Sequence, residues 1–159
     1  MIISKRILYV ILIAALTSCS QTKSLDDREK EIVIAEINEM FNNYHKDIKA
    51  GGLIAEFKYL DESSDFFWVP LGYVSALSYD SVKSILEINH QSFKSVEFSW
   101  ESLQVFPLSD EIANYSGVVK GIMTDTSGVI NRMRIIESGT VIKRLEGWKL
   151  LSGQSAILN

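Results

Sequence analysis

The sequence has few of the residues that build disulfides, metal centres and nucleic-acid interfaces. It contains one cysteine and two histidines in 159 residues. One cysteine excludes a disulfide within the chain, and neither His45 nor His90 has a paired ligand at helical or strand spacing. The net charge is -4 and no basic stripe appears between residues 20 and 159, which argues against a nucleic-acid partner. The unpaired histidines predict no metal site. There is no Gly-x-Ser-x-Gly elbow for a serine nucleophile and no glycine-rich phosphate loop, and we expect no cofactor.

The single cysteine, Cys19, closes an export signal. The basic pair Lys5-Arg6 precedes the apolar run Ile7 to Leu16, which is too short to span a bilayer. Leu16-Thr17-Ser18-Cys19 resembles the lipobox of bacterial lipoproteins, in which the cysteine is acylated, with palmitate for example, and becomes the first mature residue. We therefore predict that residues 1–18 are a signal peptide and that Cys19 is lipidated. The predicted location is the bacterial cell envelope, with the domain in the periplasm or on the cell surface.

The rest of the chain has the composition of one globular domain. Removing Lys5 and Arg6 with the signal changes the net charge from -4 to -6. Residues 19–27 are polar and fit a lipidated tether. Hydrophobic residues at 47% and aromatics at 10% suit a soluble domain with a real core, which we place at residues 28–159.

Hydrophobic spacing predicts helices first and strands later. Apolar residues recur with helical period from Arg28 to Ala50, and Gly51-Gly52 ends that helix. Further elements are expected as a shorter helix at Leu53 to Leu60, a short strand at Phe66 to Val69, and a third helix at Tyr79 to Gln91 capped by Ser78. After Val96 the period becomes two, with turn signals at Ser109-Asp110, Asp125 to Gly128, and Glu146-Gly147. Three helices followed by a strand meander indicate an α+β fold.

This element order, with Ala113 to Gly117 and the ending Gly139-Thr140-Val141 to Gly147-Trp148-Lys149-Leu150, resembles the SnoaL-like branch of the nuclear transport factor 2-like superfamily. The resemblance covers roughly Glu29 to Leu158. It implies a cone-shaped domain, in which a curved, mostly antiparallel sheet wraps the long first helix and leaves an apolar pocket at the wide end. It also implies a homodimer formed through the open sheet face.

The resemblance also directs attention to the positions that carry catalysis in the superfamily. Tyr44 falls near the tyrosine of the ketosteroid isomerase oxyanion hole. The stretches expected to hold the base and the second acid, Phe67 to Pro70 and Ser138 to Thr140, contain no carboxylate. Gln154 stands where many SnoaL-like sequences carry a histidine after the last-strand tryptophan. These departures predict a domain without catalytic residues.

The remaining candidates form a mostly aromatic pocket for a small apolar ligand. Its expected lining residues are Tyr44, Phe67, Trp68, His90, Trp100, Tyr115 and Arg134. Core packing of Tyr44, and solvent-facing positions of His90 and Arg134, are the competing interpretations. We therefore predict a lipid-anchored, non-catalytic domain that binds a small apolar ligand or a protein partner. Two alternatives stay open: a pocket enzyme (hydrolase, isomerase or dehydratase) using His90 or Asp65, and a structural dimerisation module with a filled core.

Overall fold

The computed structural model describes residues 24–158, so Cys19, the signal peptide and most of the tether lie outside the described residues. The elements are α2 (Asp27–Gly51), the 3-10 helix η2 (Leu53–Tyr59), β1 (Phe67–Val69), α3 (Tyr79–His90), β2 (Phe93–Pro107), β3 (Ile112–Asp125), β4 (Ile130–Arg144) and β5 (Gly147–Ile157). None of the helices within residues 24–158 is long and apolar enough to cross a membrane.

Helix α2 has well-defined signals at both ends. Asp26 accepts a hydrogen bond from the Glu29 N–H at 2.7 Å, and the Glu29 carboxylate accepts one from the Asp26 N–H at 2.9 Å, which makes a capping box. Gly52 ends the helix at φ 73°, where its N–H donates to the Ile48 carbonyl. One face of the helix is buried, through Val33, Ile37, Met40, Phe41, His45 and Ile48.

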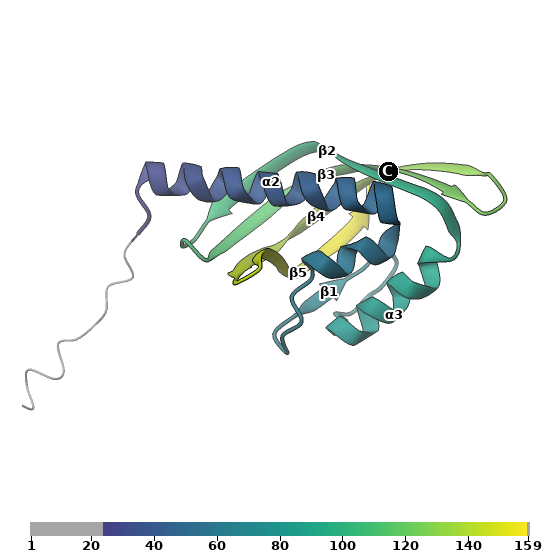
Figure 1. Cartoon of the computed structure of the whole chain (residues 1–159), viewed down its shortest axis with the longest axis horizontal. Helices are drawn as coiled ribbons and strands as arrows, with labels where there is room; N and C mark the ends of the chain where they lie inside the picture. The colour runs from purple at the N-terminus through teal and green to yellow at the C-terminus, as the bar shows by residue number, and fades with distance from the viewer. Residues whose placement is uncertain (1–23, 159) are drawn as a thin grey trace, which may run out of the picture.

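The five strands form one curved sheet in the order β1-β5-β4-β3-β2. The β1–β5 pair is parallel and the other three pairs are antiparallel. Register shifts between Trp100 and Ser102 in β2, and between Thr140 and Val141 in β4, are bulge-like irregularities that increase bending and twist. As a result the sheet curves around α2, with η2, β1 and α3 gathered at one end (Figure 1).

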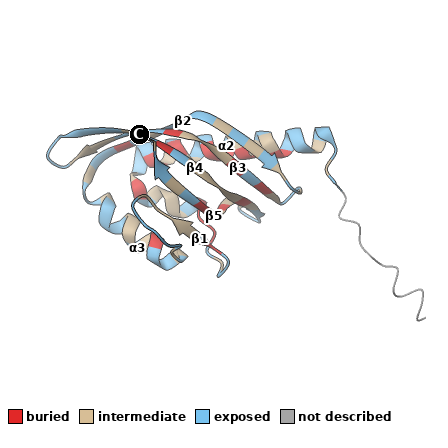
Figure 2. Cartoon of the chain, turned by 180° about the vertical axis from the view of Figure 1, so that it is seen from behind, coloured by how far each residue is buried: buried red, intermediate tan, exposed pale blue. Residues whose placement is uncertain are grey.

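The core lies between α2 and the concave face of the sheet. Its fully buried members come from both layers and include Ile37, Phe41, Tyr115, Val141 and Leu150. From behind, the sheet stands in front of α2, and its convex face is largely exposed or half-buried (Figure 2). Among residues 24–158, no helix covers that convex face.

The expected α+β class and the order of elements are confirmed, with one difference in the second helix. The helical spacing of Leu53, Ile54, Phe57 and Leu60 predicted this element. The segment is a 3-10 helix, in which residues three apart share a face. Leu53, Glu56 and Tyr59 therefore face inward, while Ile54 is exposed.

Candidate functional site

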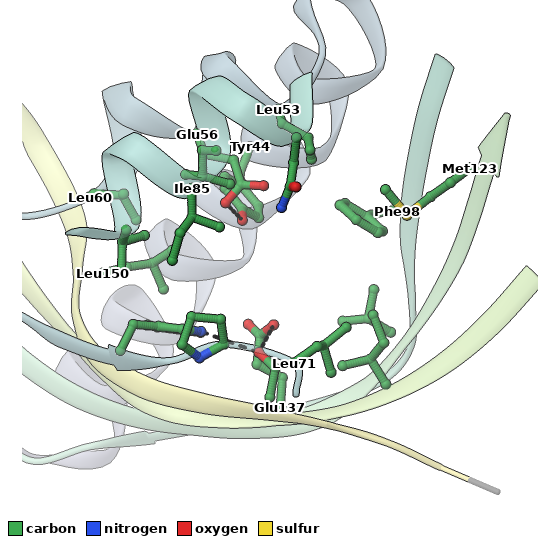
Figure 3. A pocket seen from close by; sticks show the side chains of 18 of the residues that line it. Tyr44, Leu53, Glu56, Leu60, Leu71, Ile85, Phe98, Met123, Glu137 and Leu150 are labelled. Carbon is green, nitrogen blue, oxygen red and sulfur yellow. Dashed lines mark hydrogen bonds between the residues drawn. The ribbon is translucent and has the colours of Figure 1, made fainter. Parts of the chain in front are cut away.

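A cavity of about 220 Å³ opens between the concave sheet face and the cluster formed by η2, α3 and the end of α2. Most of its wall is apolar, and Figure 3 shows side chains from helices and strands converging on it. The apolar wall includes Leu53, Leu60, Ile85, Phe98, Met123 and Leu150. Such a mostly apolar cavity with a few polar groups is the usual form of a small-molecule site.

Two glutamates point into the cavity from opposite sides (Figure 3). Glu56 comes from η2, and its Oε2 accepts a hydrogen bond from the Tyr44 hydroxyl at 3.0 Å. Glu137 comes from β4, and its Oε1 accepts one from the Tyr115 hydroxyl at 2.9 Å. Each carboxyl group is thus held by a tyrosine from another element.

A second hydrogen-bond chain reaches Glu137 from the sheet edge. The Trp68 indole N–H donates to Ser155 Oγ at 3.3 Å, and the Ser155 hydroxyl donates to Glu137 Oε2 at 3.3 Å. Trp68 of β1 and Ser155 of β5 both line the cavity. These two hydrogen bonds link the Trp68 ring to the Glu137 carboxyl group across the neighbouring strands β1, β5 and β4.

Burial raises the pKa values of both carboxyl groups into the neutral range. The pKa of Glu137 rises to about 7, because desolvation outweighs the hydrogen bonds from Tyr115 and Ser155. The pKa of Glu56 rises to about 8, mainly through desolvation, against the Tyr44 hydrogen bond and with a contribution from the charge of Glu137. Both groups therefore exchange protons close to neutral pH.

His45 is the histidine that faces this cavity. It is 9% exposed, and burial lowers its pKa to about 4, so the ring is neutral at neutral pH. Its ring centroid lies 5.6 Å from that of Trp100 and 6.3 Å from that of Phe98. No hydrogen bond joins its ring nitrogens to any of the described residues.

The cavity carries no positive side chain. Neither lysine nor arginine lines it within residues 24–158. The described residues also contain no group of three or more histidine, cysteine, aspartate or glutamate side chains able to hold a metal ion. The chemistry available to a ligand is therefore that of two carboxyl groups, a neutral imidazole, the Asn89 amide, hydroxyl groups and aromatic rings.

Comparisons with known proteins identify the fold. By sequence, the chain matches no protein-family model and no curated protein. Among solved structures, a candidate scytalone dehydratase from Novosphingobium aromaticivorans is similar with a TM-score of 0.74 and 17% identity, over 84% of this chain and 89% of that one. A nuclear transport factor 2-like superfamily protein from Salmonella enterica has a TM-score of 0.70 and 12% identity, over 82% and 94% of the two chains. The chain has the nuclear transport factor 2-like fold.

A third similar structure is a type 3 hexachlorocyclohexane dehydrochlorinase (LinA) from Novosphingobium barchaimii, with a TM-score of 0.65 and 11% identity, over 84% and 92% of the two chains. At these identities the likeness concerns the nuclear transport factor 2-like fold alone. The chemistry of this cavity has to be argued from its own side chains.

Within this fold, four of the predicted pocket residues come together. Tyr44 and Trp68 line the cavity. Tyr115 is 2% exposed, and its hydroxyl donates a hydrogen bond to Glu137. Trp100 lies on the same concave face and packs edge-on against Tyr115, with ring centroids 6.1 Å apart.

The other three predicted residues lie away from the cavity. Phe67 is 47% exposed on the convex face, because neighbouring residues of a strand point to opposite faces. Arg134 also lies on the convex face, where two of its nitrogens donate to the Glu101 carboxylate at 2.9 and 2.8 Å. His90 stands at the end of α3 against Gly52, beside a separate hollow.

The two stretches in which acids were expected contain no carboxylate, but two glutamates outside them line the cavity. Glu137 directly precedes the stretch Ser138 to Thr140 that was expected to hold the second acid. Glu56 lies in η2, outside the stretch expected to hold the base, and the 3-10 geometry turns it inward. Asp65, the acid suggested for an enzyme, is exposed and does not line the cavity.

Gln154, at the position where a histidine was expected, does not face the cavity, whereas the next residue, Ser155, does. Trp148 and Leu150 face the core, and simple alternation would turn Gln154 inward as well. The register shift opposite Thr140 and Val141 reverses the alternation, so that Gln154 is exposed and Ser155 lines the cavity. The useful sequence signal was the pair of glutamates in otherwise apolar surroundings, together with His45 on the buried face of α2.

Proposed function

We propose that this chain is a lipid-anchored protein of the bacterial cell envelope whose domain binds a small, largely apolar molecule in the cavity. The observation that carries the proposal is the cavity itself, whose apolar wall surrounds two tyrosine-held carboxyl groups. The apolar body of a ligand would lie against the leucine, isoleucine and phenylalanine side chains. Its polar group would reach Glu56 and Glu137.

Filling the cavity tests this proposal. Ile85 lines the cavity from α3, whereas Ile88 on the same helix is 68% exposed. Ile85→Trp should remove a ligand that native mass spectrometry detects on protein purified from its own host, and Ile88→Trp should leave it bound. A ligand retained by both variants would place its site elsewhere.

The anchor is tested separately at Cys19, which is the sole cysteine. Cys19→Ala should move the folded protein from the membrane fraction to the soluble fraction, because acyl chains contribute about 0.8 kcal/mol per buried methylene. If the variant is folded and still sediments with membranes, the lipid-anchor proposal is wrong.

Acid–base catalysis is the second candidate function, favoured by the pKa values of the two carboxyl groups. With pKa values of about 7 for Glu137 and about 8 for Glu56, one group can accept a proton while the other holds one near neutral pH. Two of the similar structures carry the names of elimination enzymes, a dehydratase and a dehydrochlorinase. Turnover of ester, steroid or epoxide substrates that is lost in Glu137→Gln but kept in Glu97→Gln would support this candidate.

A further inference from the structure

The hydroxyl donors bonded to the two cavity carboxyl groups, and the indole N–H behind one of them, are already used within the protein. The Tyr44 hydroxyl donates to Glu56, and the Tyr115 and Ser155 hydroxyls donate to Glu137. The Trp68 N–H donates to Ser155. The polar end of the cavity therefore presents carboxyl oxygens with unused lone pairs, including Oε1 of Glu56, which has no partner among the described residues. A ligand that matches this end in its deprotonated form supplies donors.

The charged groups of the cavity lining also favour a ligand that carries hydrogen-bond donors over an anion. The titratable groups that line the cavity or lie beside the two carboxyl groups are Tyr44 and His45 from α2, Tyr59 from η2, Tyr73 from the segment between β1 and α3, and Tyr115 from β3. α3, β1, β2 and β5 contribute only apolar or uncharged polar side chains to the lining. An anionic ligand would meet two carboxyl groups and no compensating cation, so anions are disfavoured.

Aromatic rings complete a surface that suits a cation. Tyr44, Trp68, Tyr73 and Phe98 all line the cavity. The faces of such rings attract ammonium groups, most strongly where water is excluded. His45 adds a neutral ring that lines the cavity and has no hydrogen-bond partner among residues 24–158.

We propose that the cavity binds an organic amine, with the ammonium group between Glu56 and Glu137 and an apolar body against the aromatic and aliphatic wall. This inference rests on the proposed small-molecule function and names the ligand class. Binding forms an ion pair and releases to solvent a proton held by the carboxyl pair, so amine binding and deprotonation of the cavity are coupled.

The test compares 2-phenylethylamine with 2-phenylethanol, which is neutral and of nearly equal size. Both are titrated calorimetrically into the full-length protein in a mild detergent, in buffers of different ionisation enthalpy. The amine should bind about tenfold or more tightly than the alcohol at pH 7.5. Below the Glu137 pKa of about 7, its affinity should fall by up to about tenfold per pH unit as one proton is released.

Variants assign the effect to the cavity. Glu137→Gln and Glu56→Gln keep the side-chain shape, and the double variant should weaken the amine to the level of the alcohol while alcohol binding changes by less than about twofold. Glu97→Gln is the matched control, because Glu97 is exposed and paired with Lys49 outside the cavity. Variant and wild type are compared at the same detergent concentration, so that the loss of probe into micelles is equal in both titrations.

The outcomes separate this inference from the function on which it depends. Alcohol binding that equals or exceeds amine binding overturns the amine assignment and keeps the small-molecule cavity. Amine binding that is tight but unchanged in the double variant also overturns it. If neither probe binds and Ile85→Trp removes no ligand from protein of the native host, both proposals are wrong.

Discussion

Glu56 and Glu137 make the free energy of unfolding depend on pH. Both carboxyl groups titrate near pH 4.5 when unfolded, whereas their folded pKa values are about 8 and about 7. A group with a raised folded pKa stabilises the protein fully below its unfolded pKa, and that stability is lost as the pH rises through the folded pKa. The unliganded domain should therefore lose stability between pH 6.5 and 8.5.

His45 sets the lower limit of this window. Its folded pKa is about 4 against 6.5 when unfolded, so below pH 6.5 the unfolded state binds the extra proton and stability falls toward acid. Above pH 6.5 the ring is neutral in both states and only the carboxyl groups contribute to the change. Below pH 6.5, the pH dependence from His45 and that from the two glutamates have opposite signs and partly cancel.

We predict that thermal melts show this loss between pH 6.5 and 8.5, on the order of 1 to 2 kcal/mol for each glutamate. Glu56→Gln and Glu137→Gln should each flatten the dependence, because an amide does not titrate. Glu97→Gln, outside the cavity, should follow the wild type. A wild-type melting temperature that stays constant or rises from pH 6.5 to 8.5 would contradict the assigned burial of the two carboxyl groups.

Strand β1 depends on a glycine of its neighbour to place the Trp68 ring. Trp68 pairs with Gly153 of β5, and a Cβ added to Gly153 would lie 2.6 Å from carbons of the indole ring and 2.7 Å from the Ser138 carbonyl oxygen. The indole thus fills the space that a side chain at residue 153 would occupy. This contact aims the Trp68 N–H at Ser155.

We predict that Gly153→Ala displaces Trp68, destabilises the domain by about 1–3 kcal/mol and weakens ligand binding. Thermal melts and tryptophan fluorescence measure the two effects. Ser152→Ala changes the convex face of the same strand and should cost less than about 0.5 kcal/mol. Trp68→Leu in the Gly153→Ala background should recover part of the stability, and no recovery would assign the loss to the Ser138 carbonyl instead.

Element boundaries followed from sequence more readily than the direction of individual side chains. Long segments such as α2 carry both a helical period and end signals, so Arg28 to Ala50 predicted a helix that spans Asp27–Gly51. In η2 only the apolar residues were read as the inner face, although Glu56 follows Leu53 by three residues and shares its face in a 3-10 helix. In β5 the direction of the side chains depended on a register shift in the pairing with β4. Glu137 follows the regular alternation of β4 with Ile135 and Val141, and it was missed because the acid was expected one residue later.

At the scale of the whole molecule, the cavity and the start of the described residues lie at opposite ends of α2. The chain enters at Asp27, and Tyr44 and His45 lie near the other end of the helix (Figure 1). Seventeen residues at 1.5 Å each separate Asp27 from Tyr44 by about 25 Å along the axis. The predicted tether at residues 19–27 would therefore join the domain at the end of α2 away from the cavity.

The convex sheet face is the remaining large surface without a covering layer. Val118 and Ile136 are cross-strand partners on that face, and Ile136 is 44% exposed. Ile122 and Phe106 add further exposed apolar area on the same side. One face of this sheet already packs on α2, so burying apolar side chains of the other face needs a second molecule.

We predict that the domain self-associates as a dimer through this face, and that Ile136→Glu shifts it toward monomer by placing a charge within the buried apolar patch. Sedimentation velocity of residues 20–159 measures both states. Ile88→Glu is the control: Ile88 is 68% exposed on α3, away from the convex face, so its replacement should leave the dimer intact. A wild-type domain that stays monomeric at high micromolar concentration rules out the dimer. A dimer that persists in Ile136→Glu but is lost in Ile88→Glu would move the interface to the helical side, next to the cavity.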